Sequence, residues 1–243
     1  MPANDDELLA RAIAKLDRLV GLGEDDRRAL AELPFRMGAA RANQMLVREG
    51  DQTVDCYVLL SGYACRHKLA GDGGRQIVSF HVPGDILDIQ HLLLPRADHH
   101  LEAITEIRFA RIAADALRRL MRERPRIGEA LWRDTLIDAS IFREWVLNVG
   151  RRDAKARIAH MLCEFAVRRE AAGLGGPERF ELPMTQAHIA DATGLTPIHV
   201  NRSLRALSEE GVIARERRHL EILDWDRMKR VADFDPLYLH AAA

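Results

Sequence analysis

The segment 183–211 constrains the fold of this chain more than any other part. It reads P-M-T-Q-A-H-I-A-D-A-T-G-L-T-P-I-H-V-N-R-S-L-R-A-L-S-E-E-G. Thr185 suits the N-cap of a helix over 186–193, and Gly194 comes where that helix must stop and turn with a positive φ. Thr196 can cap a second helix, whose first turn holds a proline that needs no N–H there. The spacing predicts a helix-turn-helix with its second helix in a major groove of DNA.

The exposed side of this second helix carries side chains that can contact DNA. Arginine can bond guanine in bidentate fashion, asparagine can pair with adenine, and histidine can donate to a base or a phosphate. We expect the contacting set to be Thr196, His199, Asn201, Arg202 and Arg205. The alternative is a helical hairpin of the same shape that only packs within the protein.

Two alternating segments follow, over 212–215 and 219–223, and predict a β-hairpin. The turn between them contains Arg217 and Arg218, which in a winged helix would contact phosphates. The alternative is a turn whose arginines are only solvated. The net charge of the 243 residues is −1, but basic residues outnumber acidic ones over 151–230, where the motif lies.

The region from about 40 to 112 has a different character. Short apolar runs alternate with turn signals such as Ser61-Gly62 and Gly71-Asp72-Gly73-Gly74. Strands at such regular spacing predict a small antiparallel roll or barrel. We expect three parts: a sensor domain over 1–124, a long helix over 125–150, and a DNA-binding domain over 151–243.

The long helix has apolar residues on more than one face and has to bury them. It can pack against its own roll, or it can pair with a second copy of the chain. We expect a homodimer, because two recognition helices related by two-fold symmetry match a palindromic site. The residues expected at the dimer interface are Leu131, Ile137, Ile141 and Trp145.

Composition excludes several classes of protein. No apolar run approaches the roughly 20 residues needed to cross a bilayer, and the N-terminal residues show no signal peptide. We therefore expect a cytoplasmic protein without a membrane partner. Cys56, Cys65 and Cys163 are not at metal-binding spacing, so we expect no metal site and no cofactor.

Landmarks along the whole chain resemble the Crp/Fnr family of transcription regulators, the cyclic-AMP receptor protein type. They are Glu49-Gly50-Asp51, Tyr57-Val58-Leu59-Leu60-Ser61-Gly62 and Pro83-Gly84-Asp85-Ile86, followed by the long helix and the winged motif. The resemblance implies an α+β protein. It would have a double-stranded β-roll sensor domain like a cyclic-nucleotide-binding domain, a dimerising helix, and a C-terminal winged helix-turn-helix. Its partners would be double-stranded DNA with a palindromic operator, and RNA polymerase.

The sensor domain departs from two branches of that family. Cyclic-nucleotide-binding members have a Glu for the ribose and an Arg-Ser pair for the phosphate, and the matching positions here are Ile89 and His99-His100. A phosphodiester would lose its bidentate partner, so we do not expect cyclic AMP as the effector. The oxygen-sensing branch uses an N-terminal cysteine cluster, and no cysteine precedes Cys56.

The recognition helix departs as well. The family's Arg-Glu-x-x-x-Arg set falls on Pro197, Ile198 and Arg202, of which only Arg202 is kept. We therefore expect base contacts to move to His199, Asn201 and Arg202.

Five histidines fall in the roll: His67, His81, His91, His99 and His100. They could bind haem or a metal or act as a pH switch, and a regulator dependent on haem or a small molecule is the main alternative. We expect no ligand on them, because their spacing is not a tight ligand pattern. A metal-dependent enzyme of the cupin type is not expected, since adjacent residues on a strand, such as His99 and His100, point to opposite faces.

Overall fold

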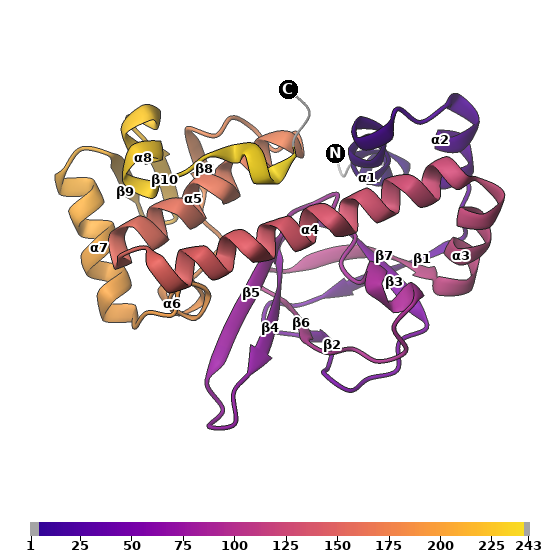
Figure 1. Ribbon diagram of the computed structural model, residues 1–243, viewed down its shortest axis with the longest axis horizontal. Coiled ribbons are helices and arrows are strands. Elements are labelled where there is room, and N and C mark those ends of the chain that lie inside the picture. Colours follow the sequence, from indigo (N-terminus) through magenta and orange to yellow (C-terminus); the bar gives the residue numbers. More distant parts are fainter. Residues whose placement is uncertain (1–4, 241–243) are drawn as a thin grey trace. The chain divides into compact units, whose positions relative to one another are not determined.

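The computed structural model describes residues 5–240 and divides into two compact units (Figure 1). The first unit consists of the described residues up to Lys68 together with Phe80–Ala139. The second consists of Leu69–Ser79 and the described residues from Ser140 onward. Helices and antiparallel sheets occur in the same chain, which confirms the α+β class. Within residues 5–240, no helix combines the length and the apolar character needed to span a membrane.

The β-roll and its flanking helices occupy the chain up to the long helix α4. The elements are α1 (Asp5–Val20), α2 (Glu24–Ala31), β1 (Phe35–Ala40), β2 (Met45–Val47), β3 (Asp55–Ser61), β4 (Ala64–Leu69), β5 (Arg75–His81), η1 (Ile89–Leu92), β6 (His100–Ala103), β7 (Ile107–Ala113), α3 (Ala114–Glu123) and α4 (Pro125–Arg151). The strands form two sheets, with orders β1-β7-β3 and β2-β6-β4-β5 (Figure 1). This is the predicted antiparallel roll.

Strand β3 shows how the roll is filled. Its side chains alternate between the two faces of the sheet, as a strand requires. Cys56, Val58 and Leu60 belong to an apolar cluster shared with α1, α3 and α4. Leu59 belongs to a second cluster of buried apolar residues, which also contains Leu101 of β6 and Ile107 of β7. One strand therefore joins the helices to the roll.

The apolar runs that predict the roll lie at 45–47, 57–60, 77–81 and 104–112 and correspond to β2, β3, β5 and β7. Strands β1, β4 and β6 have no such run and were not predicted. In β4, Arg66 and His67 are buried, which a hydrophobic pattern does not anticipate. Arg66 Nη1 donates to Asp138 Oδ2 at 2.7 Å, and His67 Nε2 lies 3.2 Å from a Glu102 carboxylate oxygen on β6. Burial of such groups is tolerated when each has a partner, and these partners come from distant parts of the sequence.

The second unit contains the predicted winged motif. Its elements are α5 (Ala154–Ala171), β8 (Arg179–Glu181), α6 (Gln186–Thr193), α7 (Pro197–Glu209), β9 (Ile213–Glu216), β10 (His219–Ile222), α8 (Trp225–Ala232) and η2 (Pro236–Leu239). The strand order is β8-β10-β9. Ile158, Leu162, Leu204 and Leu220 are fully buried and connect α5 and α7 with the sheet.

A buried carboxylate joins α5 to its neighbours in the second unit. Glu164 is 2% exposed and accepts hydrogen bonds from Trp145 Nε1 at 3.0 Å and from the Tyr238 hydroxyl at 2.9 Å. Arg168 lies one turn further along α5, with Nη1 3.5 Å from the carboxylate. Burial raises the pKa of Glu164 above its ordinary value, against the opposing effect of Arg168.

All three cysteines are buried thiols. Cys56 and Cys65 lie in the first unit and Cys163 in the second. Burial raises the pKa of Cys56 and of Cys163 to about 12, so neither is a thiolate at neutral pH.

Candidate nucleic-acid interface

The helix-turn-helix forms with the predicted caps. Thr185 Oγ1 accepts from the His188 backbone N–H at 3.2 Å, and His188 Nδ1 accepts from the Thr185 backbone N–H at 3.4 Å, which makes a reciprocal capping box. Gly194 ends α6 in the left-handed conformation, with φ of +66° and ψ of +35°. The sharp turn that brings the two helices together is therefore encoded locally.

Thr196 begins the recognition helix α7. Its hydroxyl oxygen accepts from the His199 N–H at 3.3 Å, and Pro197 occupies the first turn. The same hydroxyl lies 3.1 Å from His199 Nδ1. The imidazole is thereby held at the start of α7, where His199 is exposed.

The two faces of α7 differ sharply in composition. Val200, Ser203, Leu204 and Leu207 are buried against the domain. The opposite face exposes Ile198, Asn201, Arg202 and Arg205, which we call the α7 stripe. Ile198 is three and four residues before Asn201 and Arg202, and Arg205 is four and three residues after them, so the four side chains lie along one face of the helix.

Each residue predicted to contact DNA from α7 is exposed there. His199 lies beside the stripe, and Thr196 lies at the helix N-terminus. Arg205 Nε donates to Glu209 Oε1 at 2.7 Å, one turn further along α7. This ion pair is exposed and therefore weak, so the guanidinium can exchange it for a phosphate or a base.

The wing is the hairpin of β9 and β10. Glu216 pairs with His219 in the antiparallel register, so the turn consists of Arg217 and Arg218. Arg217 has a positive φ of +53°, and both side chains are exposed. Arg218 Nη1 lies 3.9 Å from Glu181 Oε1, and both side chains are exposed. The predicted basic turn is thus confirmed as a hairpin turn whose two arginines are exposed.

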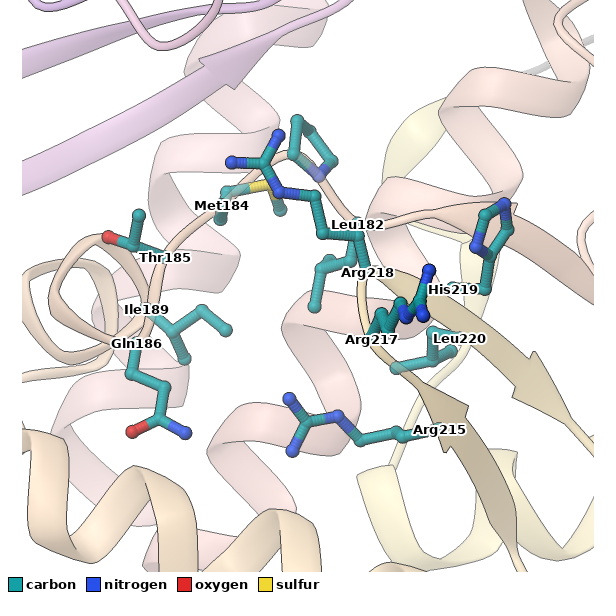
Figure 2. A pocket seen from close by; sticks show the side chains of 11 residues that line it. Leu182, Met184, Thr185, Gln186, Ile189, Arg215, Arg217, Arg218, His219 and Leu220 are labelled. Atoms are coloured by element: carbon teal, nitrogen blue, oxygen red, sulfur yellow. The ribbon is translucent and has the colours of Figure 1, made fainter.

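A pocket of about 170 Å³ lies between the wing and the start of α6, and we call it the wing pocket. Figure 2 shows Arg215 reaching from β9 into this space, with Gln186 of α6 on the other side. Arg217 and Arg218 also line it. Three guanidinium groups near a helix N-terminus favour an anion such as a phosphate.

Gln186 and Arg215 were not among the DNA contacts predicted from the sequence, although both line this pocket. Gln186 is the first residue of α6, and Arg215 pairs across the hairpin with Leu220. Their positions beside the N-cap and before the basic turn could have suggested them. Their common pocket could not have been predicted, because it depends on how the wing packs beside α6.

The predicted dimer residues lie mostly inside their own units. Leu131 is 1% exposed, Ile141 6% and Trp145 8%, and Ile137 is half-buried. The apolar side chains that α4 exposes are instead Trp132, Leu136, Val146 and Leu147. The helix has apolar residues on several faces, and spacing alone did not identify which face the rest of the chain covers.

The three residues considered for an effector are in separate environments. Ile89 packs against the apolar cluster beneath α1. His99 is buried, with Nε2 3.0 Å from Asp88 Oδ1 and Nδ1 2.7 Å from Asp98 Oδ1. His100 accepts from the Glu49 N–H and stacks on His67 at 5.0 Å. As expected for adjacent residues, the two histidines have different surroundings.

The roll histidines are held mainly by carboxylates. His81 Nδ1 lies 3.6 Å from Asp85 Oδ2, and His91 stacks on His99 at 6.0 Å. Burial lowers the pKa of His81 and of His91, so both are neutral near pH 7. Across residues 5–240, no group of three or more His, Cys, Asp or Glu side chains is arranged to hold a metal ion.

Two protein-family models match this chain, and both descriptions agree with the geometry above. One is described as a cyclic nucleotide-binding domain and matches residues 39–124. The other is described as a Crp-like helix-turn-helix domain and matches residues 156–231.

Relatives in several bacteria match most of the chain. The transcriptional activator protein FnrL of Cereibacter sphaeroides is 31% identical over 199 residues, which are 80% of this chain and 79% of FnrL. The nitrogen fixation regulation protein FixK of Rhizobium meliloti is 30% identical over 203 residues, which are 82% of this chain and 89% of FixK. The solved structure of FixK2 from Bradyrhizobium japonicum matches with a TM-score of 0.75 and 25% identity, covering 82% of this chain and 98% of FixK2.

Proposed function

This chain belongs to the Crp/Fnr family of transcription regulators, and on that premise we propose that it binds a palindromic operator as a homodimer. The α7 stripe would face the base edges of successive major grooves, and the wing pocket would hold a flanking phosphate. RNA polymerase would be the second macromolecular partner. Because the proposed partner is chromosomal DNA, we expect the protein to act in the cytoplasm.

The observation that carries this proposal is the α7 stripe. Arg202 and Asn201 are adjacent to one another on the outer face, beside His199. These residue types can each make specific bonds in a major groove. The apolar face of the same helix is buried, so the outer face is presented by a rigid element. The relatives named above are regulators, and we propose no catalytic activity.

The experiment that tests the proposal is selection of bound genomic fragments by the purified protein at moderate salt. We expect a shared two-fold symmetric site. Recovery only after addition of a cell extract would show that an effector is required. Recovery of fragments without any common site, with and without extract, would contradict the proposal.

The selected site then allows a test of the bases contacted. Arg202→Ala should lower affinity for the site far more than for unrelated DNA, and should relax the preference at one position of each half-site by about 1–3 kcal/mol. Arg28→Ala is the matched control, because it removes the same charge from an exposed position on α2. Equal preference in Arg202→Ala and Arg28→Ala would argue against base contact through α7.

A further inference from the structure

The α7 stripe contains one apolar side chain. Ile198 is 80% exposed and lies in the first turn of α7, next to Asn201 and Arg202 on the same face. It makes no contribution to the core, which Val200 and Leu204 reach from the other face. Single exposed apolar residues are common on proteins, so its exposure alone says little. The relevant observation is its position, because Ile198 lies among the side chains that would face DNA.

The major groove offers apolar side chains one distinctive partner, the C5-methyl group of thymine. Residues at the N-terminal end of a recognition helix are those that contact base edges. Isoleucine has no hydrogen-bond donor or acceptor to offer there. The family pattern has a glutamate at this position, which can accept from the amino group of cytosine. The two side chains would therefore select different bases.

We propose that Ile198 contacts the methyl group of a thymine and sets a preference for that base at one position of each half-site. The inference rests on the proposed function and deepens it. His199 is held at the cap by Thr196, and Arg202 lies one turn beyond Ile198. Thymine recognition would thus lie beside the base pairs contacted by Asn201 and Arg202.

The test removes only the methyl group from the DNA. Each thymine of the selected site is replaced by deoxyuridine, at symmetric positions, and affinity is measured at fixed salt. One position should show a loss of about fourfold per half-site, the factor expected for burial of one methyl group. Ile198→Ala, whose side chain ends at Cβ, should show a smaller loss at that position than the wild-type protein does.

Two further variants sharpen the result. Ile198→Glu should move the preference at the same position from thymine to cytosine, by about tenfold. Leu237→Ala is the matched control, because Leu237 is 77% exposed and lies outside the winged motif, on η2. It should keep the sensitivity of the wild-type protein to deoxyuridine. Ile198 and Leu237 are both exposed, so the three variants should fold.

The outcomes separate this inference from the proposed function. If the wild-type protein binds its site but tolerates deoxyuridine at every thymine, Ile198 does not contact a methyl group and only this inference is wrong. The same holds if Ile198→Ala keeps the loss seen for the wild-type protein. If no specific site exists, both the inference and the proposed function are wrong.

Discussion

At the scale of single residues, Gly194 holds the helix-turn-helix in a conformation that other residues adopt with strain. Its φ is +66°, and a Cβ there would meet Val149 Cγ1 at 3.3 Å. We expect Gly194→Ala to lower the free energy of unfolding by about 1–2 kcal/mol, because the left-handed conformation is unfavourable for residues with a Cβ. Urea denaturation monitored by circular dichroism would measure the change.

Gly150 provides the matched control for that substitution. It lies within α4, and a Cβ there has no neighbour within 4 Å. Gly150 is the penultimate residue of α4, so Gly150→Ala should stabilise the protein slightly, by at most about 0.5 kcal/mol, since alanine favours a helix more than glycine does. The same sign of change in both variants would contradict this account of the turn.

Glu164 gives a prediction about pH. Burial raises its pKa in the folded protein, so between its ordinary pKa of about 4.3 and its folded pKa the folded state binds more protons than the unfolded state. The free energy of unfolding must then fall as pH rises through this range. Glu164→Gln removes the ionisation and should flatten the dependence on pH.

The comparison requires denaturation curves of the wild-type protein and Glu164→Gln from pH 4.5 to 8. Glutamine can still accept from Trp145, so the substitution preserves the shape of the site. Glu221→Gln is the control, because Glu221 is an exposed residue of the same unit. Parallel pH profiles for the wild-type protein and Glu164→Gln would show that Glu164 does not titrate as described.

Residues that act on their immediate neighbours were predictable from sequence. Thr185 and Thr196 cap the N-termini of α6 and α7, and Gly194 ends α6, as predicted. Each of these interactions lies within one helical turn. The opposite case is Arg215, whose significance depends on the packing of the wing beside α6. Trp145 is similar, because its indole N–H donates to Glu164, a residue of another helix.

At the scale of elements, the wing should supply affinity without sequence preference. Arg217 and Arg218 lie at its tip, and each neutralised phosphate contributes about 0.9 to the slope of log K against log salt. We expect Arg217→Ala with Arg218→Ala to lower the magnitude of that slope by about 2. Affinity for the operator and for unrelated DNA should fall by similar factors.

Fluorescence anisotropy at several salt concentrations would measure these slopes. A double variant that removes exposed arginines outside the motif and outside α4, Arg28→Ala with Arg122→Ala, is the control for the loss of net charge. A wing variant that changes the preferred site, with an unchanged salt slope, would mean that the wing contacts bases.

Some elements were predictable and others were not, for a physical reason. Strands β2, β3, β5 and β7 have the apolar runs that mark buried strands. Strands β4 and β6 bury His67 and Glu102 against each other, so their sequences look like those of exposed segments. A pattern of hydrophobicity cannot show that two polar residues will be neighbours when 35 positions separate them.

At the scale of the whole molecule, α4 exposes apolar surface that a second copy of the chain would cover. Leu136 is 53% exposed and Trp132 68%, one turn apart on the same face. If the proposed dimer forms here, Leu136→Glu would place a charge in an apolar interface, which is strongly unfavourable. We expect the variant to sediment near the chain mass of 27.4 kDa.

Leu237→Glu is the control, because it places the same charge at an exposed leucine outside α4. It should sediment as the wild-type dimer does. If Leu136→Glu remains dimeric, the interface lies elsewhere on the molecule. The monomeric variant should also lose most of its operator affinity, because one half-site provides only half of the contacts.

The buried cysteines allow transient local unfolding of this protein to be measured by thiol labelling. A thiol that is enclosed and protonated reacts with an alkylating reagent only while its surroundings are transiently unfolded. Cys56 and Cys65 would report such events in the first unit and Cys163 in the second. Mass spectrometry of each cysteine-containing peptide after timed labelling would therefore measure the rate of local unfolding separately in each unit. Adding operator DNA should slow the alkylation of Cys163. An effector bound to the roll should slow the alkylation of Cys56 and Cys65.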